Sequence, residues 1–198
     1  MHADAEPQTK SSPPRGGTRD RILDAANELF YAHGIRAVSA DRIIEQVGIT
    51  KVTFYRHFRS KSDLVVAYLR QQAAAERGWL EGSVLEGDAL GSLRAIASGI
   101  GAASCRPGFR GCAFINAAAE FSDPDDPVRE VVREHRNWML GAFEAVVAGA
   151  QVEDRSAVAR RLMLLRDGAM VGGYLGEPDT LADALSGAFA AVIIPVAS

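Results

Sequence analysis

Apolar residues recur at helical spacing along almost the whole chain of 198 residues, and no stretch shows the strict alternation of a half-buried β-strand. Between Thr18 and Gly34, for example, they recur every three or four positions and form one face of a helix. The pattern therefore predicts an all-α fold. The expected helices cover residues 18–33, 39–47, 50–58, 60 onward, 89–104, 110–121, 127–150, 155–174 and 180–194. Helix N-caps are expected at Thr18, Ser39, Thr50, Ser60, Asp126 and Thr180.

Composition favours a globular protein without a membrane span. Hydrophobic residues make up 47% of the chain and charged residues 24%, which is ordinary for a globular protein. The longest apolar stretch, residues 184–197, contains Pro195 and falls short of the ~20 residues that a spanning helix needs. Two cysteines, Cys105 and Cys112, are too few for a disulfide scaffold, and they fit a reducing cytoplasm.

The chain divides into three predicted parts. Residues 1–17 are rich in Pro, Ser and Gly and have no apolar segment, so we expect a disordered arm and not a secretory signal. Residues 18–64 form a small N-terminal bundle, and residues 65–198 form a larger helical body. Residues 1–70 carry 11 Lys and Arg against 8 Asp and Glu, whereas residues 71–198 carry 11 against 17. A basic end on an acidic body suits a protein that presents one end to a polyanion.

The most informative segment runs from Ser39 to Phe58, where two short predicted helices meet at Gly48. Glycine permits the positive φ of a tight turn, so the segment has the form of a helix-turn-helix. The second helix presents a dense set of hydrogen-bond donors within two turns, which suits the major groove of DNA. Its outward positions are Lys51, Thr53, Tyr55, Arg56 and His57. The alternative is a three-helix bundle whose short third helix is simply polar.

The runs from Thr18 to Phe30 and from Val47 to Leu64, with His33-Gly34 between them, resemble the N-terminal domain of the TetR family of transcriptional regulators. The resemblance implies an all-α homodimer in which the first three helices bind DNA and the remaining helices bind an inducer and dimerise. It implies phosphate contacts for Tyr55 and Lys61. Asp41 departs from the family pattern, because this position is often basic, so helix 39–47 is expected to contribute little to base contacts. The DNA-binding residues expected in all are Ser39, Thr50, Lys51, Val52, Thr53, Tyr55, Arg56, His57 and Lys61.

The body is less informative, although residues 110–121 resemble the sixth helix of one large branch of the same family. A small-molecule effector pocket is expected between its helices, lined by large apolar groups and a few polar ones. The candidates are Phe114, Asn116, Glu120, Trp138, Phe143, Met163, Asp167, Met170 and Tyr174. Asn116, Glu120 and Asp167 are the more suggestive, since polar groups on apolar helices need partners. For the apolar candidates, ordinary core is the alternative.

Two apolar, small-residue faces predict a homodimer through helices 155–174 and 180–194, although a buried core within one subunit would look the same. These faces comprise Leu162, Leu165, Ala169, Gly172 and Gly173, followed by Leu181, Leu185, Ala188, Phe189, Val192 and Ile193.

The sequence thus predicts a repressor that a small-molecule inducer releases from a palindromic operator. Redox control through Cys105 and Cys112, or a DNA binder without an effector, are the alternatives. An enzyme is not expected, because no metalloprotease, phosphate-loop or nucleophile-elbow motif occurs. No cofactor or metal is expected either: His2, His33 and His57 fit the tail, a helix end and the recognition helix, which leaves His135 alone.

Overall fold

The computed structural model describes residues 16–176 and 178–193, and within these ranges the chain is helical without a β-strand. The all-α prediction is therefore confirmed. The elements are α1 Thr18–His33, α2 Ala40–Val47, α3 Lys51–His57, α4 Lys61–Ser83, α5 Ala89–Ser104, α6 Ala113–Glu120, α7 Pro127–Val146, the 3₁₀ turn η1 Val147–Gly149, α8 Arg155–Leu175 and α9 Pro178–Ile193. The predicted arm, residues 1–17, lies outside the described residues apart from Gly16 and Gly17.

Side-chain caps fix most of the helix starts where the sequence predicts them. The hydroxyl of Ser39 accepts from the amide of Arg42 at 3.2 Å, and that of Ser60 accepts from the amide of Asp63 at 3.0 Å. Such caps satisfy amides that have no partner inside the helix. The prediction for Thr18 is wrong: Gly17 is the cap, and its amide donates to Asp20 Oδ2 at 3.2 Å.

Three other boundaries differ from the sequence expectation. Helix α6 begins at Ala113, because Gly111 has a φ of +73° that no helix accommodates. Helix α7 ends at Val146 and tightens into the 3₁₀ turn η1. Helix α9 already begins at Pro178, so Thr180 lies inside it and caps nothing.

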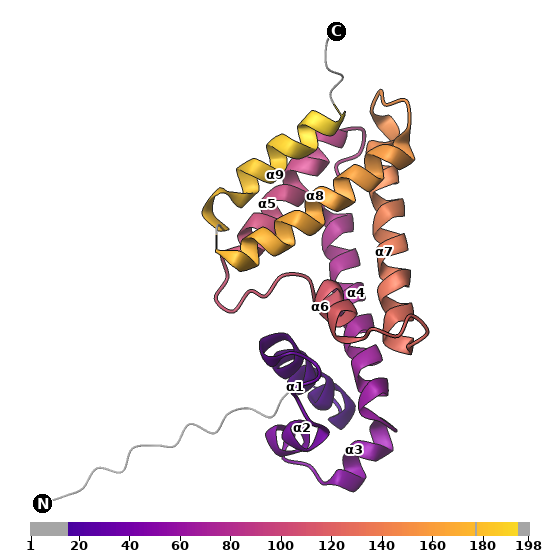
Figure 1. Cartoon of the computed structure of the whole chain (residues 1–198), viewed down its shortest axis with the longest axis vertical. Coiled ribbons are helices and arrows are strands. Elements are labelled where there is room, and N and C mark those ends of the chain that lie inside the picture. Colours follow the sequence, from indigo (N-terminus) through magenta and orange to yellow (C-terminus); the bar gives the residue numbers. More distant parts are fainter. Residues whose placement is uncertain (1–15, 177, 194–198) are drawn as a thin grey trace, which may run out of the picture.

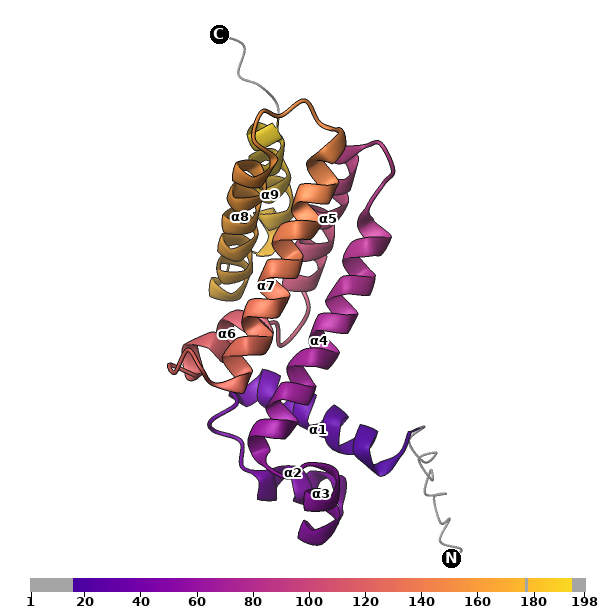
Figure 2. The same cartoon turned by 90° about the vertical axis from the view of Figure 1, so that its right-hand side faces the viewer.

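The molecule is elongated, with α1–α3 at one end and the body at the other (Figures 1 and 2). Helix α4 runs from the small end into the body, where it lies along α7. One buried core joins α1–α3 and the first half of α4 to α6 and the start of α7. A second core lies among α5, α7, α8 and α9. The small end and the body are therefore packed together through α4 and α6, not joined by a free linker.

None of the described helices is long and apolar enough to cross a membrane.

Candidate DNA-binding surface and effector cavity

The turn between α2 and α3 depends on Gly48, which has φ 69° and ψ 44° in the left-handed region. Its amide donates to the carbonyl of Ile44 at 3.0 Å and closes α2. Ile43 and Phe54 are fully buried beneath the turn and hold the two helices at their angle. The segment is therefore a helix-turn-helix, as the sequence predicts.

The outward face of α3 consists of side chains that the fold itself leaves free. Val52 is 71% exposed and Tyr55 is 41% exposed, large values for residues of their size. Arg56 and His57 are also exposed, and within the described part of the chain no ion pair or hydrogen bond engages their side chains. The hydroxyls of Thr50 and Thr53 lie 2.9 Å apart at the start of the helix. Because packing leaves the side chains of Val52, Tyr55, Arg56 and His57 exposed, these four are available to a partner.

Two of the predicted DNA-binding cations have neighbours within the protein. Lys51 Nζ lies 3.4 Å from Asp41 Oδ1, with both side chains largely exposed. Lys61 Nζ lies 5.9 Å from the centre of the Phe30 ring. Burial lowers the pKa of Lys61, an effect that the negative charge of Glu120 opposes.

Other basic side chains near this surface have structural partners. Arg21 Nη2 donates to the carbonyl of Val47 at 2.6 Å and ties α1 to the end of α2. Arg42 Nη2 lies 3.1 Å from His33 Nε2. Arg42, although exposed, thus has a partner at the end of α1.

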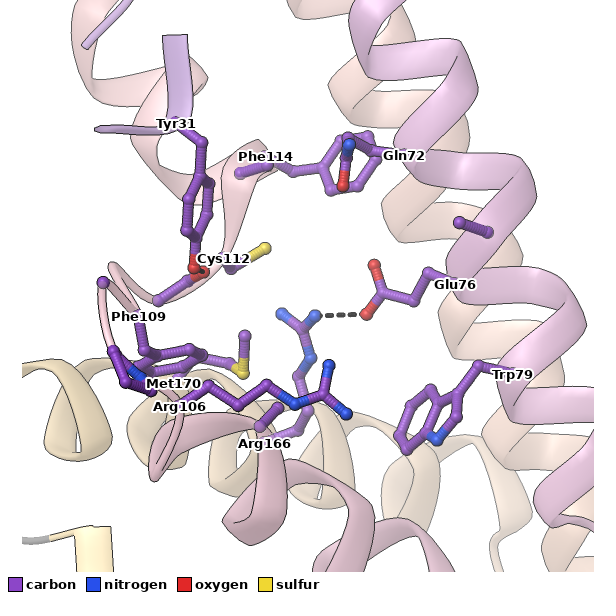
Figure 3. A pocket seen from close by; sticks show the side chains of 16 residues that line it. Tyr31, Gln72, Glu76, Trp79, Arg106, Phe109, Cys112, Phe114, Arg166 and Met170 are labelled. Carbon is purple, nitrogen blue, oxygen red and sulfur yellow. Dashed lines mark hydrogen bonds and ion pairs between the residues drawn. The ribbon is translucent and has the colours of Figure 1, made fainter. Parts of the chain in front are cut away.

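A cavity of about 500 Å³ lies where α4, α8 and the start of α6 meet the loop that connects α5 to α6 (Figure 3). Its volume is in the range of pockets that take small organic molecules. The apolar wall consists of the side chains of Tyr31, Trp79, Phe109, Cys112, Phe114 and Met170. The polar wall consists of Gln72, Glu76, Arg106 and Arg166.

A network of buried charges forms one side of this cavity. Arg166, only 3% exposed, donates to Glu76 Oε1 at 2.5 Å and to Asp167 Oδ1 at 3.2 Å. His135 Nε2 lies 3.0 Å from Glu76 Oε2, and the His135 ring stacks on Phe114 with 3.6 Å between ring centres. Burial alone would raise the pKa of Glu76, but contact with His135 and the charge of Arg166 outweigh it and hold that pKa below its usual range. Glu76 is therefore ionised at neutral pH.

The structure places the nine predicted effector residues in five different environments. Phe114 and Met170 line the cavity. Trp138, Phe143 and Met163 pack in the core of the body, and Tyr174 is exposed on α8. Asp167 pairs with Arg166 and, at 2.8 Å, with Arg136. Asn116 and Glu120 bind backbone groups and line a much smaller cavity of about 30 Å³.

Sequence reasoning missed most of the residues that line the larger cavity, among them Tyr31, Glu76, Trp79, Arg106 and Arg166. Glu76 carried a signal, because it is an acid that directly follows a run of three alanines in the helix predicted from residue 60 onward. Pro107-Gly108 carried another, since it marks the loop that brings Arg106 and Phe109 to the cavity. Tyr31 carried none, because its contacts are with residues about 80 positions away.

The end of α1 is fastened to the body by a set of hydrogen bonds, which we call the α1–α6 joint: Tyr31, Ile35 and Arg36 on one side, Arg110, Gly111 and Glu120 on the other. The Tyr31 hydroxyl accepts from the amide of Arg110 at 2.9 Å and donates to the carbonyl of Gly111 at 3.0 Å. The Glu120 carboxylate accepts from the amide of Ile35 at 2.9 Å and from that of Arg36 at 2.6 Å. These four hydrogen bonds thus fasten the end of α1 to the α5–α6 loop and to α6.

The two cysteines are free thiols in different environments. Cys112 is buried in the wall of the cavity, whereas Cys105 is exposed at the other end of the α5–α6 loop. A redox role for them stays a prediction.

The exposed apolar face of the body is not the one that the sequence singled out. Leu162, Ala169, Gly173, Leu185, Phe189 and Ile193 are buried within the subunit and cannot form an outward face, whereas the other five predicted residues, Leu165, Gly172, Leu181, Ala188 and Val192, are half-buried. The exposed face of α8 instead carries Leu164, Val171 and Leu175, which are 71%, 45% and 77% exposed. Helix α9 lies beside α8, and its exposed positions include three small residues, Ala184, Gly187 and Ala191, after the polar Asp179, Thr180 and Asp183. We call the three exposed apolar residues of α8 and these three small residues of α9 the α8–α9 stripe.

Comparison with known proteins covers both parts of the chain. Residues 22–68 match the family described as bacterial regulatory proteins, tetR family, and residues 89–161 match the tetracyclin repressor-like C-terminal domain. Among curated proteins, the chain is 38% identical over 58 residues to the HTH-type transcriptional activator FasR of Mycolicibacterium smegmatis, which is 29% of this chain and 26% of that protein. It is 38% identical over 69 residues to the uncharacterized HTH-type transcriptional regulator YvkB of Bacillus subtilis, or 35% and 34% of the two. These matches span about a quarter to a third of the relatives' length.

Solved structures match nearly the whole chain. SCO4454, a TetR-family transcriptional regulator from Streptomyces coelicolor, has a TM-score of 0.84 and 39% identity over 89% of this chain and 94% of that one. The reduced form of NemR from E. coli has a TM-score of 0.79 over 89% and 98% of the two chains, and its 18% identity supports the fold alone.

Proposed function

Because the chain belongs to the TetR family of bacterial transcriptional regulators, we propose that it is a homodimeric repressor whose operator is released when a small molecule enters the cavity beside Arg166. That it is a DNA-binding regulator and not an enzyme follows from the family. The palindromic operator, the inducer and the roles of individual residues are the proposed part.

One observation carries the proposal: the loop of residues 105–112 faces the cavity on one side and holds the end of α1 on the other. Arg106, Phe109 and Cys112 line the cavity, whereas Arg110 and Gly111 bind Tyr31. A molecule that displaces this loop would therefore shift α1, and with it α2, which packs on α1 and leads into the recognition helix. Helix α4 provides a second connection, because it runs from the cavity wall at Glu76 to the cap at Ser60 beside α3.

Release by a small shift follows from the geometry of a dimer on DNA. Two recognition helices must reach major grooves about 34–36 Å apart, or a multiple of one turn, which favours a palindromic operator. A change of a few ångströms in their separation prevents both helices from docking at once, and the gain from simultaneous binding is lost.

The DNA-contact assignment is tested first by Tyr55→Phe, which removes one hydroxyl and leaves the edge-to-face contact between the Tyr55 and Phe54 rings, 5.2 Å between centres, in place. We expect affinity for the best sequence selected from random duplex DNA to fall about tenfold, because the substitution removes a hydrogen bond from the Tyr55 hydroxyl to a charged phosphate. The loss should be similar on unrelated sequences, since phosphate contacts carry no sequence information. The measurement is a DNA titration at fixed salt.

Tyr174→Phe is the matched control, because Tyr174 is similarly exposed (49% against 41%) but lies on α8, outside α1–α3, with its ring centre 5.8 Å from the guanidinium carbon of Arg110. Equal affinities for wild type and Tyr55→Phe would contradict the placement of α3 on DNA.

The signalling part of the proposal is tested at the α1–α6 joint by Glu120→Ala, which removes both hydrogen bonds to the backbone after α1. We expect operator affinity to stay within about threefold. The factor by which a releasing molecule, found by screening, lowers that affinity should fall about tenfold, as expected for the loss of one coupling contact. Calorimetry of the same molecule should show direct binding nearly unchanged.

Glu130→Ala serves as the control, since Glu130 is an exposed acid on α7 outside the joint. If Glu120→Ala responds to the molecule as fully as Glu130→Ala does, the joint does not transmit the signal.

A further inference from the structure

We propose that the cavity beside Arg166 takes a small aromatic anion, whose carboxylate or similar acid group lies between Arg106 and Arg166. The inference rests on the proposed function in one respect, that this cavity is the effector site. It adds the chemical class of the effector, which neither the fold nor the relatives specify.

Arg166 provides an interior donor group for such an anion. Its side chain is almost fully buried, and Figure 3 shows its guanidinium group inside the cavity, facing Glu76. A guanidinium group has five N–H donors. One hydrogen bond to Glu76 and one to Asp167 leave other N–H donors of this group available to a ligand. Because the group is buried, water competes little for these donors. Burial would lower the pKa of Arg166, but the neighbouring Cys112 sulfur and the carboxylates of Glu76 and Asp167 raise it, so the cation persists.

Arg106 provides a second cation at the opening of the cavity. It is exposed, and within the described residues its side chain has no ion pair or hydrogen bond. Figure 3 shows its guanidinium group in the space between Arg166 and Trp79. A carboxylate between the two guanidinium groups would gain charge-assisted hydrogen bonds from both.

The balance of charge at the cavity wall favours an anion over a cation. Two guanidinium groups, those of Arg106 and Arg166, face one carboxylate, that of Glu76. Glu76 already has Arg166 on one oxygen and His135 on the other, so a cationic ligand would have to displace a buried partner to reach it. Displacement of that kind is costly, because it leaves a buried charge without compensation.

The rest of the wall fits a flat apolar body. Trp79 and Phe109 lie on opposite sides of the space that the two guanidinium groups enter, and Phe114 and Tyr31 close the end towards α1 (Figure 3). Aromatic rings in such walls stack on or pack edge-to-face against a planar ligand. Tyr31 also belongs to the α1–α6 joint, so a ligand that touches it would act on the connection to α1.

The experiment uses three probes of one shape and different charge: 2-naphthoate, 2-naphthamide and 2-naphthylmethylamine. Each is titrated by calorimetry into the full-length protein, into Arg106→Gln and into Arg94→Gln. Arg94 is an exposed arginine on α5 that does not line the cavity, so its replacement makes the same charge change elsewhere. We expect the naphthoate to bind at least tenfold more tightly than the amide or the amine. Arg106→Gln should bind the naphthoate about tenfold more weakly than the wild type does, with an affinity close to that for the amide. Arg94→Gln should bind the naphthoate as tightly as the wild type.

Three results would overturn the assignment of an anion: the amine or the amide binding as well as the naphthoate, Arg106→Gln binding the naphthoate like the wild type, or no probe binding at all. Operator release is measured separately with the same probes. Binding of the naphthoate without release would leave the anion site in place and contradict the ligand-released repressor, so the two proposals fail independently.

Discussion

A Glu76→Ala protein is expected to lose about 3–5 kcal/mol of its free energy of unfolding, because the substitution leaves the guanidinium group of Arg166 buried without its main counter-charge. Arg166 is 3% exposed and cannot turn towards water without disturbing α8, and Asp167 is already shared with Arg136. For a chain of this size such a loss is a large part of the total stability. Urea unfolding followed by circular dichroism measures it.

Two further variants separate the charge effect from the loss of packing. Glu81→Ala removes an exposed acid from the same helix and should change stability by less than about 0.5 kcal/mol. A double replacement, Glu76→Met with Arg166→Met, removes both charges and should recover much of the loss. If the double variant is as unstable as Glu76→Ala, packing and not charge determines the result.

The pH dependence has a definite sign. The pKa of Glu76 is lower in the folded protein than its ordinary value of 4.5, so its contribution is fully present above that value. The contribution is lost as the pH falls below 4.5 towards the folded pKa, because the unfolded chain then binds the proton more readily. Glu76→Ala should therefore show a flatter decline of stability with acid than the wild type.

Val171→Asp is expected to convert the homodimer to a monomer and to weaken operator binding by about 100-fold or more, since a monomer loses simultaneous docking of two recognition helices. Val171 lies in the middle of the α8–α9 stripe, and a carboxylate there would be buried without a partner in a symmetric interface. Sedimentation gives the mass, and a DNA titration gives the affinity.

The control for this change is Leu85→Asp. Leu85 is 50% exposed between α4 and α5, away from α8 and α9, so the same kind of substitution should leave both mass and affinity unchanged. A Val171→Asp protein that sediments as a dimer would exclude the α8–α9 stripe as the interface.

Local signals in the sequence predict the helices and their caps well, because a cap involves residues only three positions apart. Ser39, Thr50 and Ser60 each bind the amide three residues on, and such short contacts can be identified from residue type alone. The turn at Gly48 is equally local. Helix α6 was predicted too long because its start depends on the loop at Gly111, where a Cβ would lie 2.9 Å from the carbonyl oxygen of Met170 on another helix.

The cavity could not be predicted in the same way, since its walls come from four separate segments. Glu76 and Arg166 are 90 positions apart, and no spacing rule links them. The predicted outward face of α8 failed for a different reason. Apolar spacing identifies the most hydrophobic side of a helix, which in α8 is the side that carries Leu162 towards the subunit's own core. The exposed apolar side, with Leu164 and Val171, is narrower and is interrupted by Gly168.

The ion pair between Asp41 and Lys51 has a consequence for how the protein finds its site on a chromosome. A carboxylate next to the first cation of the recognition helix reduces the positive charge offered to phosphates. Binding to arbitrary DNA depends almost wholly on that charge, whereas binding to the operator also uses contacts with base edges. Sites of arbitrary sequence outnumber operators by about 10⁶ or more. Weaker binding to these sites therefore leaves more of the protein free to occupy the operator. We therefore expect Asp41 to lower affinity for arbitrary DNA more than affinity for the operator.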